Sequence, residues 1–345
     1  MSPHAPPLRG SLPPEGADPA WGGPAPDRLD FLVKVARVHA EAEDIVLLDL
    51  AREGEALPAF TAGAHIDVKT PSGAVRQYSL CNVPGEPGPY QIAVLREPSG
   101  RGGSASMHDA LAEGDTLQVS APRNHFALSE DPGPSLLFAA GIGITPIVAM
   151  AETLHAQGRD FTLHYCARSE ARTAFLQRLR GRPYADRVRF HFDGGEADRR
   201  LDIGAALAAA PPGAHVYVCG PQAFITGVQG SAARAGWPVE RVHFEHFSGA
   251  TVDTSGDGAF DVVLARSGRT VRIAPDVSIT QALAAEGVAI ETSCEQGVCG
   301  TCLTTVLEGE VDHRDLYLMP DEQAQHTQIL PCCSRAKSAR LVLDL

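Results

Sequence analysis

The chain contains no long hydrophobic run and no surplus of positive charge. None of its 345 residues belongs to an unbroken apolar stretch of the roughly 18 residues that suggest a membrane-spanning helix. Acidic residues outnumber Lys and Arg by 42 to 29, and the net charge is −13, whereas a nucleic-acid-binding domain presents a basic face. The sequence therefore predicts no membrane span and argues against nucleic acid as a partner.

The N-terminal stretch also lacks the apolar core of a secretory signal. Residues 1–28 are rich in Pro, Gly and Ala, and we expect them to form a disordered tail. Without an export signal, a cytoplasmic location is expected, where thiols stay reduced. Cysteines outside any cofactor site should then be free thiols.

The most informative pattern lies near the C-terminus, where three cysteines occur within one short loop. Four residues separate Cys294 from Cys299, two separate Cys299 from Cys302, and 29 precede Cys332. This is the plant-type spacing for a [2Fe–2S] cluster held by four thiolates. Zinc sites more often show two Cys-x₂-Cys pairs or Cys and His pairs. We therefore predict a cluster, with Cys332 or its neighbour Cys333 as the fourth ligand.

Two glycines in the same loop support this prediction. Gly297 and Gly300 tolerate the positive φ that a loop needs when it turns its N–H groups toward inorganic sulfide. A plant-type cluster accepts and passes single electrons at a low potential, about −400 mV. The C-terminal region is therefore expected to carry electrons.

The hydrophobic pattern divides the chain into three units joined by one linker. Residues 29–128 show short strands between Gly and Pro turns, which is typical of a small antiparallel barrel. Residues 129–246 alternate strands and helices, as in a doubly wound parallel sheet. Residues 247–258 read as a linker, and 259–345 as the cluster-bearing unit. The expected fold class is therefore multi-domain, α/β plus β. The expected strands are 31–38, 45–50, 64–69, 77–80, 90–95, 116–119, 135–140, 161–166, 188–192, 215–220, 260–265 and 270–273. The expected helices are 106–112, 147–157, 174–180, 201–209, 222–235 and 279–286.

Two motifs follow strands of the predicted parallel sheet. The segment Gly141–Pro146, GIGITP, stands at a strand-to-helix junction, where glycines allow close approach and a helix N-terminus offers N–H groups to an anion. The triplet Cys219–Pro221 ends another strand. Alone, the GIGITP segment is equally consistent with a tight turn, but ligands bind beyond the carboxyl ends of such strands. Both motifs are thus predicted at one edge, as a pyrophosphate site.

A second group of residues with binding potential lies in the predicted barrel. Arg76 is suited to a phosphate and Tyr78 to a flat ring. Residues 100–105 precede the barrel helix and form another anion-binding pattern. For Arg76 and Tyr78, the alternative is an exposed Arg beside a core Tyr. For residues 100–105, it is a flexible loop.

Taken in order, these motifs resemble the phthalate dioxygenase reductase family, the class IA reductases of the ferredoxin-reductase superfamily. Vanillate demethylase reductases share the pattern. The resemblance rests on Arg76-x-Tyr78-Ser79, GIGITP, Cys219-Gly-Pro and the cluster loop, with His313-Arg-Asp315 and Ser334–Ser338 as further matches. It extends from about residue 29 to Leu345.

The resemblance implies an FMN-binding barrel, an NADH-binding domain and a β-grasp ferredoxin domain. FMN is implied rather than FAD, since the ferredoxin domain follows Phe247 directly and the family lacks an adenine-binding extension. The implied FMN contacts are Arg76, Tyr78, Ser79, Val94, Arg96, Gly102, Gly103, Ser104, Thr145 and Phe247. The implied NADH contacts are Gly141, Gly143, Thr145, Pro146, Arg168, Cys219, Gly220 and Pro221, with Thr145 and Cys219 nearest the reacting atoms. The implied cluster ligands are Cys294, Cys299, Cys302 and Cys332.

The family's activity then becomes the functional expectation. NADH would reduce FMN, FMN the [2Fe–2S] cluster, and the cluster a terminal oxygenase, most readily a Rieske-type oxygenase or demethylase of aromatic catabolism. A haem monooxygenase as partner stays open, because the cofactors would be identical. A ferredoxin fused to an inert scaffold is disfavoured by the Arg76 and Gly141 motifs. NADH is expected over NADPH, although Arg168 alone would suit a 2′-phosphate.

No residue is nominated as a general acid or base, because the cofactors supply the chemistry. Five histidines are expected to be structural or at the surface: His164, His191, His243, His246 and His313.

Overall fold

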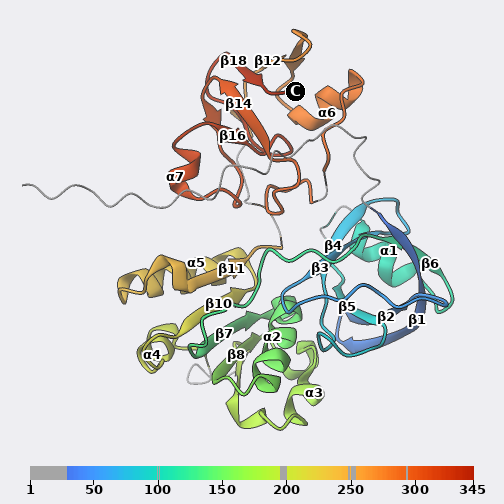
Figure 1. Cartoon of the computed structure of the whole chain (residues 1–345), viewed down its shortest axis with the longest axis vertical. Helices are drawn as coiled ribbons and strands as arrows, with labels where there is room; N and C mark the ends of the chain where they lie inside the picture. The colour runs from blue at the N-terminus through green and yellow to red at the C-terminus, as the bar shows by residue number, and fades with distance from the viewer. Residues whose placement is uncertain are drawn as a thin grey trace, which may run out of the picture.

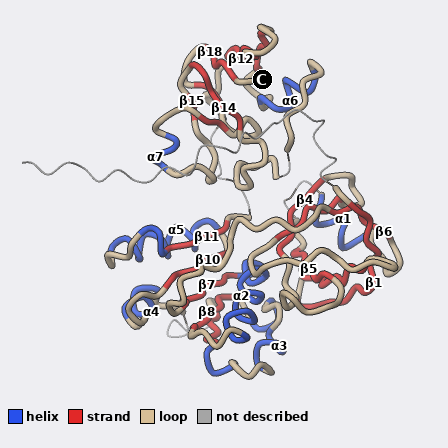
Figure 2. The backbone as a smooth tube through the Cα atoms, viewed as in Figure 1, coloured by secondary structure: helices blue, strands red, loops and turns tan. Residues whose placement is uncertain are grey.

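The computed structural model describes residues 29–98, 100, 102–194, 200–247, 249, 254–292 and 294–345. The predicted tail and part of the predicted linker lie outside these residues. Three sheet-based units follow one another along the chain, coloured blue to cyan, green to yellow, and orange to red in Figure 1. Strands and loops dominate the first and third units, and helices accumulate in the second (Figure 2).

The first unit is a six-stranded antiparallel sheet in the order β4-β3-β6-β1-β2-β5. A bridge between Leu80 and Ile92 joins its outer strands, so the sheet curls toward a barrel. Alternate residues such as Leu48, Leu50 and Ile66 fill the interior. Its strands are β1 (Phe31–Ala42), β2 (Ile45–Ala51), β3 (His65–Lys69), β4 (Val75–Ser79), β5 (Tyr90–Leu95) and β6 (Thr116–Val119).

The barrel helix α1 (Gly103–Asp109) begins and ends three residues before the predicted 106–112. Gly102 precedes it with φ 82°, a conformation that glycine adopts without strain. Met107 anchors the helix in the barrel core. The glycine run therefore leads straight into the helix.

The second unit is a five-stranded parallel sheet in the order β11-β10-β7-β8-β9. Its strands are β7 (Ser135–Ala140), β8 (Phe161–Ala167), β9 (Val188–Phe192), β10 (His215–Cys219) and β11 (Val242–Glu245). Its α-helices are α2 (Ile144–Ala156), α3 (Leu176–Arg180), α4 (Ile203–Ala208) and α5 (Gln222–Arg234). Residues of α2 and α3 cover one face, and residues of α4 and α5 the other. The sequence pattern missed β11, which is short and pairs only at the sheet edge.

One apolar cluster joins the barrel to the parallel sheet. Leu47 and Ala93 of the barrel belong to the same buried cluster as Met150 of α2 and Tyr165 of β8. Burial of apolar surface stabilises a contact by about 25 cal/mol per Å², which favours a fixed contact of this kind. The first two units are therefore packed against each other through this shared cluster.

The third unit is a mixed sheet in the order β13-β12-β18-β14-β16, with β15 and β17 paired separately. Strands β12 and β18 are parallel, and their neighbours are antiparallel. A capping box of Ser278 and Gln281 begins its helix α6. Its elements are β12 (Phe260–Leu264), β13 (Thr270–Ile273), α6 (Ile279–Ala285), β14 (Thr304–Glu308), β15 (Val311–Asp312), α7 (Pro320–Gln323), β16 (Gln328–Ile329), β17 (Arg335–Ala336) and β18 (Arg340–Leu343).

The predicted fold class is confirmed: an antiparallel barrel, a doubly wound parallel sheet and a ferredoxin-type sheet follow in the expected order. Across the described ranges, no helix is both long and apolar enough to cross a bilayer.

Candidate functional site

Four buried thiols converge in the third unit. The sulfur of Cys294 lies within hydrogen-bonding reach of those of Cys299 and Cys332, and the sulfur of Cys302 within reach of that of Cys332. The loop also turns donors toward these sulfurs, because the N–H of Gln296 donates to Cys294 Sγ at 3.3 Å. A set of four thiols with inward N–H groups fits an iron–sulfur cluster.

The cluster loop depends on two glycines for its shape. Gly297 and Gly300 have φ of 72° and 73°. A Cβ on Gly297 would lie 2.4 Å from Cys333 Sγ, and one on Gly300 would lie 2.3 Å from the ring of Tyr317. Both positive φ and lack of space therefore favour glycine here.

The two adjacent cysteines, Cys332 and Cys333, have different surroundings. Cys332 is 8% exposed and packs with Cys302, Leu318 and Leu330. Cys333 is only partly buried, and its thiol donates to the carbonyl of Leu330 at 3.6 Å. Its sulfur also contacts that of Cys332. Cys332 thus lies inside the thiol group, and Cys333 lies beside it.

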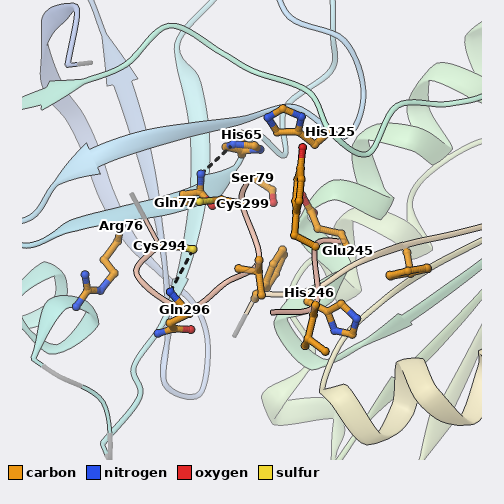
Figure 3. Close-up of a pocket in the computed structure, with 15 residues that line it drawn as sticks. His65, Arg76, Gln77, Ser79, His125, Glu245, His246, Cys294, Gln296 and Cys299 are labelled. Atoms are coloured by element: carbon orange, nitrogen blue, oxygen red, sulfur yellow. Dashed lines mark hydrogen bonds between the residues drawn. The ribbon is translucent and has the colours of Figure 1, made fainter. Parts of the chain in front are cut away.

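A cavity of about 260 Å³ lies where the three units meet (Figure 3). The barrel contributes Arg76 and Ser79, the segment after β11 contributes Phe247, and the cluster loop contributes Cys294 and Cys299. The structure therefore brings predicted flavin contacts and predicted cluster ligands to the walls of one cavity. The remaining lining residues are His65, Gln77, His125, Phe244, Glu245, His246, Gln296, Val298, Leu316 and Tyr317.

Arg76 and the glycine-rich loop also lie together, as the resemblance implied. A Cβ on Gly103 would lie 3.0 Å from Arg76 Nε, so the arginine side chain lies across the start of α1. Ser104 Oγ accepts the N–H of Glu97 at 3.0 Å and holds this loop against the end of β5. An Arg beside backbone N–H groups fits a phosphate.

Three other predicted flavin contacts are placed differently. Tyr78 packs against the barrel core, and burial raises the pKa of its phenol to about 12. Val94 is 1% exposed inside the barrel. Arg96 pairs with Asp109 at 2.6 and 2.8 Å. None of the three is among the described residues that line the cavity.

The two nucleotide motifs meet at the carboxyl edge of the parallel sheet. Strands β7 and β10 pair directly, with Ala139 opposite Cys219. A Cβ on Gly143 would lie 2.4 Å from the carbonyl oxygen of Cys219 and 2.6 Å from the N of Gly220. The GIGITP and Cys-Gly-Pro segments therefore touch, which supports the predicted common edge. Gly141, at φ 54°, begins the turn into α2, and Pro146 is buried within that helix.

The other residues of the predicted nucleotide site lie around this contact. Thr145 is 2% exposed, and its hydroxyl donates to the carbonyl of Ile142 at 3.0 Å. Cys219 is fully buried, and burial raises the pKa of its thiol. Arg168 is exposed just past β8, and Pro221 is exposed just before α5. Neither Thr145 nor Cys219 is among the described residues lining the cavity.

Sequence reasoning missed several lining residues, of which Glu245 is the most unusual. Its Oε2 is buried and has no hydrogen-bond partner among the described residues, and burial raises the pKa of the carboxyl group to about 8. The sequence offered one signal for this residue: an acidic side chain at the end of a strand, two residues before the predicted flavin contact Phe247. His65 and Gln77 were also missed; they hydrogen-bond each other at 3.2 Å across β3 and β4.

The five histidines expected to be structural have varied surroundings. His164 and His191 lie 3.0 Å apart between ring nitrogens, as do His215 and His243, and each pair is stacked. His313 contacts Asp315 at 3.3 Å. His246 differs, because it lines the cavity, and burial lowers the pKa of its imidazole.

Comparison with known proteins gives matches over nearly the whole chain. A family model of the 2Fe-2S iron-sulfur cluster binding domain matches residues 262–337, and a model of the oxidoreductase NAD-binding domain matches 137–230. A vanillate O-demethylase oxidoreductase of Pseudomonas sp. (strain HR199 / DSM 7063) is 48% identical over 91% of this chain and 99% of its own length. The phthalate dioxygenase reductase of Burkholderia cepacia is 42% identical, with 93% and 99% covered.

Solved structures give the same picture. The structure of a phthalate dioxygenase reductase matches with a TM-score of 0.73 at 42% identity, covering 91% of this chain and 98% of that one. An intact type IV self-sufficient cytochrome P450 monooxygenase matches with a TM-score of 0.77 at 42% identity. The chain covers 41% of the length of that P450 protein.

Fold, site and comparisons together define an NADH-dependent oxidoreductase that carries FMN and a [2Fe–2S] cluster. The chain belongs to the phthalate dioxygenase reductase family. It is a reductase component of an oxygenase system, and its protein partner is an oxygenase.

Proposed function

We propose that this reductase serves a Rieske-type oxygenase or demethylase that acts on aromatic compounds in the cytoplasm. The cavity shared by Arg76, Ser79 and Phe247 with Cys294 and Cys299 supports electron transfer from a flavin to the cluster, which either kind of oxygenase would need. The choice of partner rests on the relatives. The named relatives include a vanillate O-demethylase oxidoreductase and a phthalate dioxygenase reductase.

In this proposal each unit holds one group. Residues 29–128 bind FMN, with Arg76 on its phosphate and Phe247 beside its ring. Residues 129–246 bind NADH at the Gly143–Cys219 contact. Residues 259–345 hold the cluster through Cys294, Cys299, Cys302 and Cys332, and residues 247–258 link the last two units. FMN, when bound, accepts the electron pair of a hydride and releases electrons singly, which the cluster requires.

The chain's own residues form the walls against which these groups would be oriented. Leu316 and Tyr317 line the cluster side of the cavity, and Phe244 lines the side of the parallel sheet. Gly143 and Gly220 let backbone approach backbone at the nucleotide edge. Burial of the thiols of the cluster loop lowers their contact with solvent and favours electron transfer within the protein.

A haem monooxygenase is the second candidate partner, favoured by the structural match to the self-sufficient P450 protein. The deciding experiment mixes the purified holoprotein and NADH with a Rieske oxygenase, and separately with a haem monooxygenase. We expect faster reduction of the Rieske centre. Faster reduction of the haem would overturn the proposed partner and leave the reductase activity intact.

The order of transfer has its own test. A Cys299→Ser variant that lacks the cluster should still oxidise NADH with an artificial acceptor of flavin electrons, since hydride arrives at the flavin. In the wild type, flavin absorbance should bleach before or with that of the cluster in stopped flow. A variant that cannot reduce its flavin would contradict this order.

A further inference from the structure

Two distant segments meet at the wall of the cavity: the stretch that leaves β11 and the loop that carries Cys294. The backbone N–H of Gly249 donates to the side-chain Oε1 of Gln296 at 3.1 Å. The backbone N–H of Gln296 in turn donates to Cys294 Sγ at 3.3 Å, as Figure 3 shows. Gln296 therefore connects the linker to a cluster ligand through two of its own groups.

The packing at this contact leaves no room for a side chain on residue 249. A Cβ on Gly249 would lie 2.1 Å from the carbonyl oxygen of Gln296 and 3.1 Å from its Cβ. The φ of Gly249 is outside the left-handed region, so close approach is what favours glycine here. The linker backbone and the cluster loop are thus in direct contact.

The contact lies beside the predicted flavin site. Gln296 lines the cavity together with Phe247, which precedes Gly249 by two residues, and with Arg76 of the barrel. Any shift of Gln296 away from Gly249 would also move Cys294 relative to these walls. The Gly249–Gln296 hydrogen bond is therefore placed to fix the distance across the cavity between the cluster loop and the barrel wall.

The far end of the linker is also attached to the third unit. Asp257 accepts two hydrogen bonds from Arg314, at 2.8 and 2.5 Å, and both side chains are largely buried. Next to Arg314, the Cα of Asp315 lies 3.0 Å from a Cβ built on Gly297. Gly249 thus contacts the cluster loop directly, and Asp257 attaches the far end of the linker to Arg314 of the same unit.

We propose that Gln296 is a positioning residue that docks the cluster loop on the flavin cavity, with Gly249 as its partner. The inference rests on the proposed placement of FMN in this cavity. Gln296 itself carries no electrons; it sets the distance that they cross. Because electron transfer slows as the distance between donor and acceptor grows, the loss of Gln296 should slow the flavin-to-cluster step and leave hydride arrival unchanged.

The test uses the holoprotein with Gln296→Ala and Gly249→Ala. Amide exchange at Gly249, followed by NMR, should be roughly fivefold faster in Gln296→Ala, as expected for one lost hydrogen bond. In stopped flow with NADH, bleaching of the cluster should slow severalfold in both variants, while bleaching of the flavin keeps its wild-type rate. Gln296→Glu keeps an acceptor oxygen for Gly249 and should restore most of the cluster rate. Gln325→Ala, at an exposed glutamine of the same unit, is the matched control and should behave as wild type.

Several outcomes would overturn the proposal. Unchanged exchange at Gly249 in Gln296→Ala would show that the contact does not form in solution. A wild-type rate of cluster reduction in both variants, or equal slowing of the flavin and cluster phases, would show that it does not position the loop. Iron content is measured for each variant. Should Gln296→Ala lose its cluster, the rates measured on Gly249→Ala test the proposal instead. If Arg76→Ala kept full FMN affinity, the flavin placement would fail, whereas the exchange result at Gly249 would stand.

Discussion

Cys219 and Glu245 occupy paired positions on the adjacent parallel strands β10 and β11. Cys219 is fully buried, and this burial raises the pKa of the Cys219 thiol. The negative charge of the Glu245 carboxylate raises that pKa further. Glu245 lines the flavin-side cavity, while Cys219 contacts Gly143 of the nucleotide motif. This pair therefore lies between the two candidate sites, with the Oε2 atom of Glu245 buried.

The first prediction concerns the pH dependence of stability. Burial raises the pKa of Glu245 from 4.5 to about 8, so the folded protein binds this proton more tightly than the unfolded chain. The resulting stabilisation is fully present below pH 4.5 and is lost as the pH rises through about 8. Glu245→Gln should remove this slope. Melting temperatures measured across this range should therefore fall more steeply in wild type than in the variant.

The control for this prediction is Glu240→Gln, at an exposed acid close in the chain. It should keep the wild-type slope. Parallel pH profiles for wild type and Glu245→Gln would contradict the assignment of the buried proton.

The second prediction separates the two neighbouring cysteines. Cys332→Ser should abolish the paramagnetic signal of the reduced cluster, because Cys332 lies inside the group of four thiols. Cys333→Ser should keep the signal, since its sulfur lies beside that group against Gly297. Iron analysis and electron paramagnetic resonance check both variants. The reverse result would move the fourth ligand to Cys333.

The third prediction concerns FMN affinity. Arg76→Ala should weaken FMN binding roughly tenfold to hundredfold, the range expected when a charged hydrogen-bond donor is lost. Fluorescence titration of the flavin-free protein measures the dissociation constant. Arg37→Ala, at an exposed arginine of β1, should leave it unchanged. Equal affinities in wild type and Arg76→Ala would remove Arg76 from the phosphate site.

The fourth prediction is a larger kcat/KM for NADH than for NADPH. It follows the family resemblance, and Arg168 is the residue placed to modify it, because it is exposed just past the carboxyl end of β8. If Arg168 contacts a 2′-phosphate, Arg168→Ala should reduce the remaining NADPH activity more than the NADH activity. Steady-state kinetics with both nucleotides decide the matter. Comparable kcat/KM values in wild type would contradict the preference.

The fifth prediction concerns docking on the oxygenase. From Gly258 onward the chain has 12 acidic residues against 7 basic ones. An acidic ferredoxin domain should approach a basic patch on its partner faster at low ionic strength. Electron transfer to the oxygenase should therefore slow as salt is added, because ions screen exposed charges. A rate that does not depend on salt would show that the acidic surface has no role in encounter.

The sequence alone determined the chemistry and most of the element order. Cysteine spacing indicated the cluster because three of the four thiolate ligands stand at plant-type intervals in one short loop. The glycine-rich junction at Gly141 and the strand ending at Cys219 predicted one edge of a parallel sheet, because the carboxyl ends of parallel strands lie together. Local periodicity located nearly all the strands of the first two units, but not β11 at the sheet edge.

Only the tertiary structure decided how these parts meet. Nothing local in the sequence relates Arg76 to Cys294, because the two are brought to one cavity by the packing of three separate units. The same holds for Gln296, whose role depends on a linker residue 47 positions away, and for Glu245, whose pKa depends on burial. Spacing along a chain reports short-range geometry, whereas burial and contacts between units arise from the folded whole. The sequence therefore specified which cofactors this protein binds, and the fold specified how closely its flavin and cluster sites approach each other.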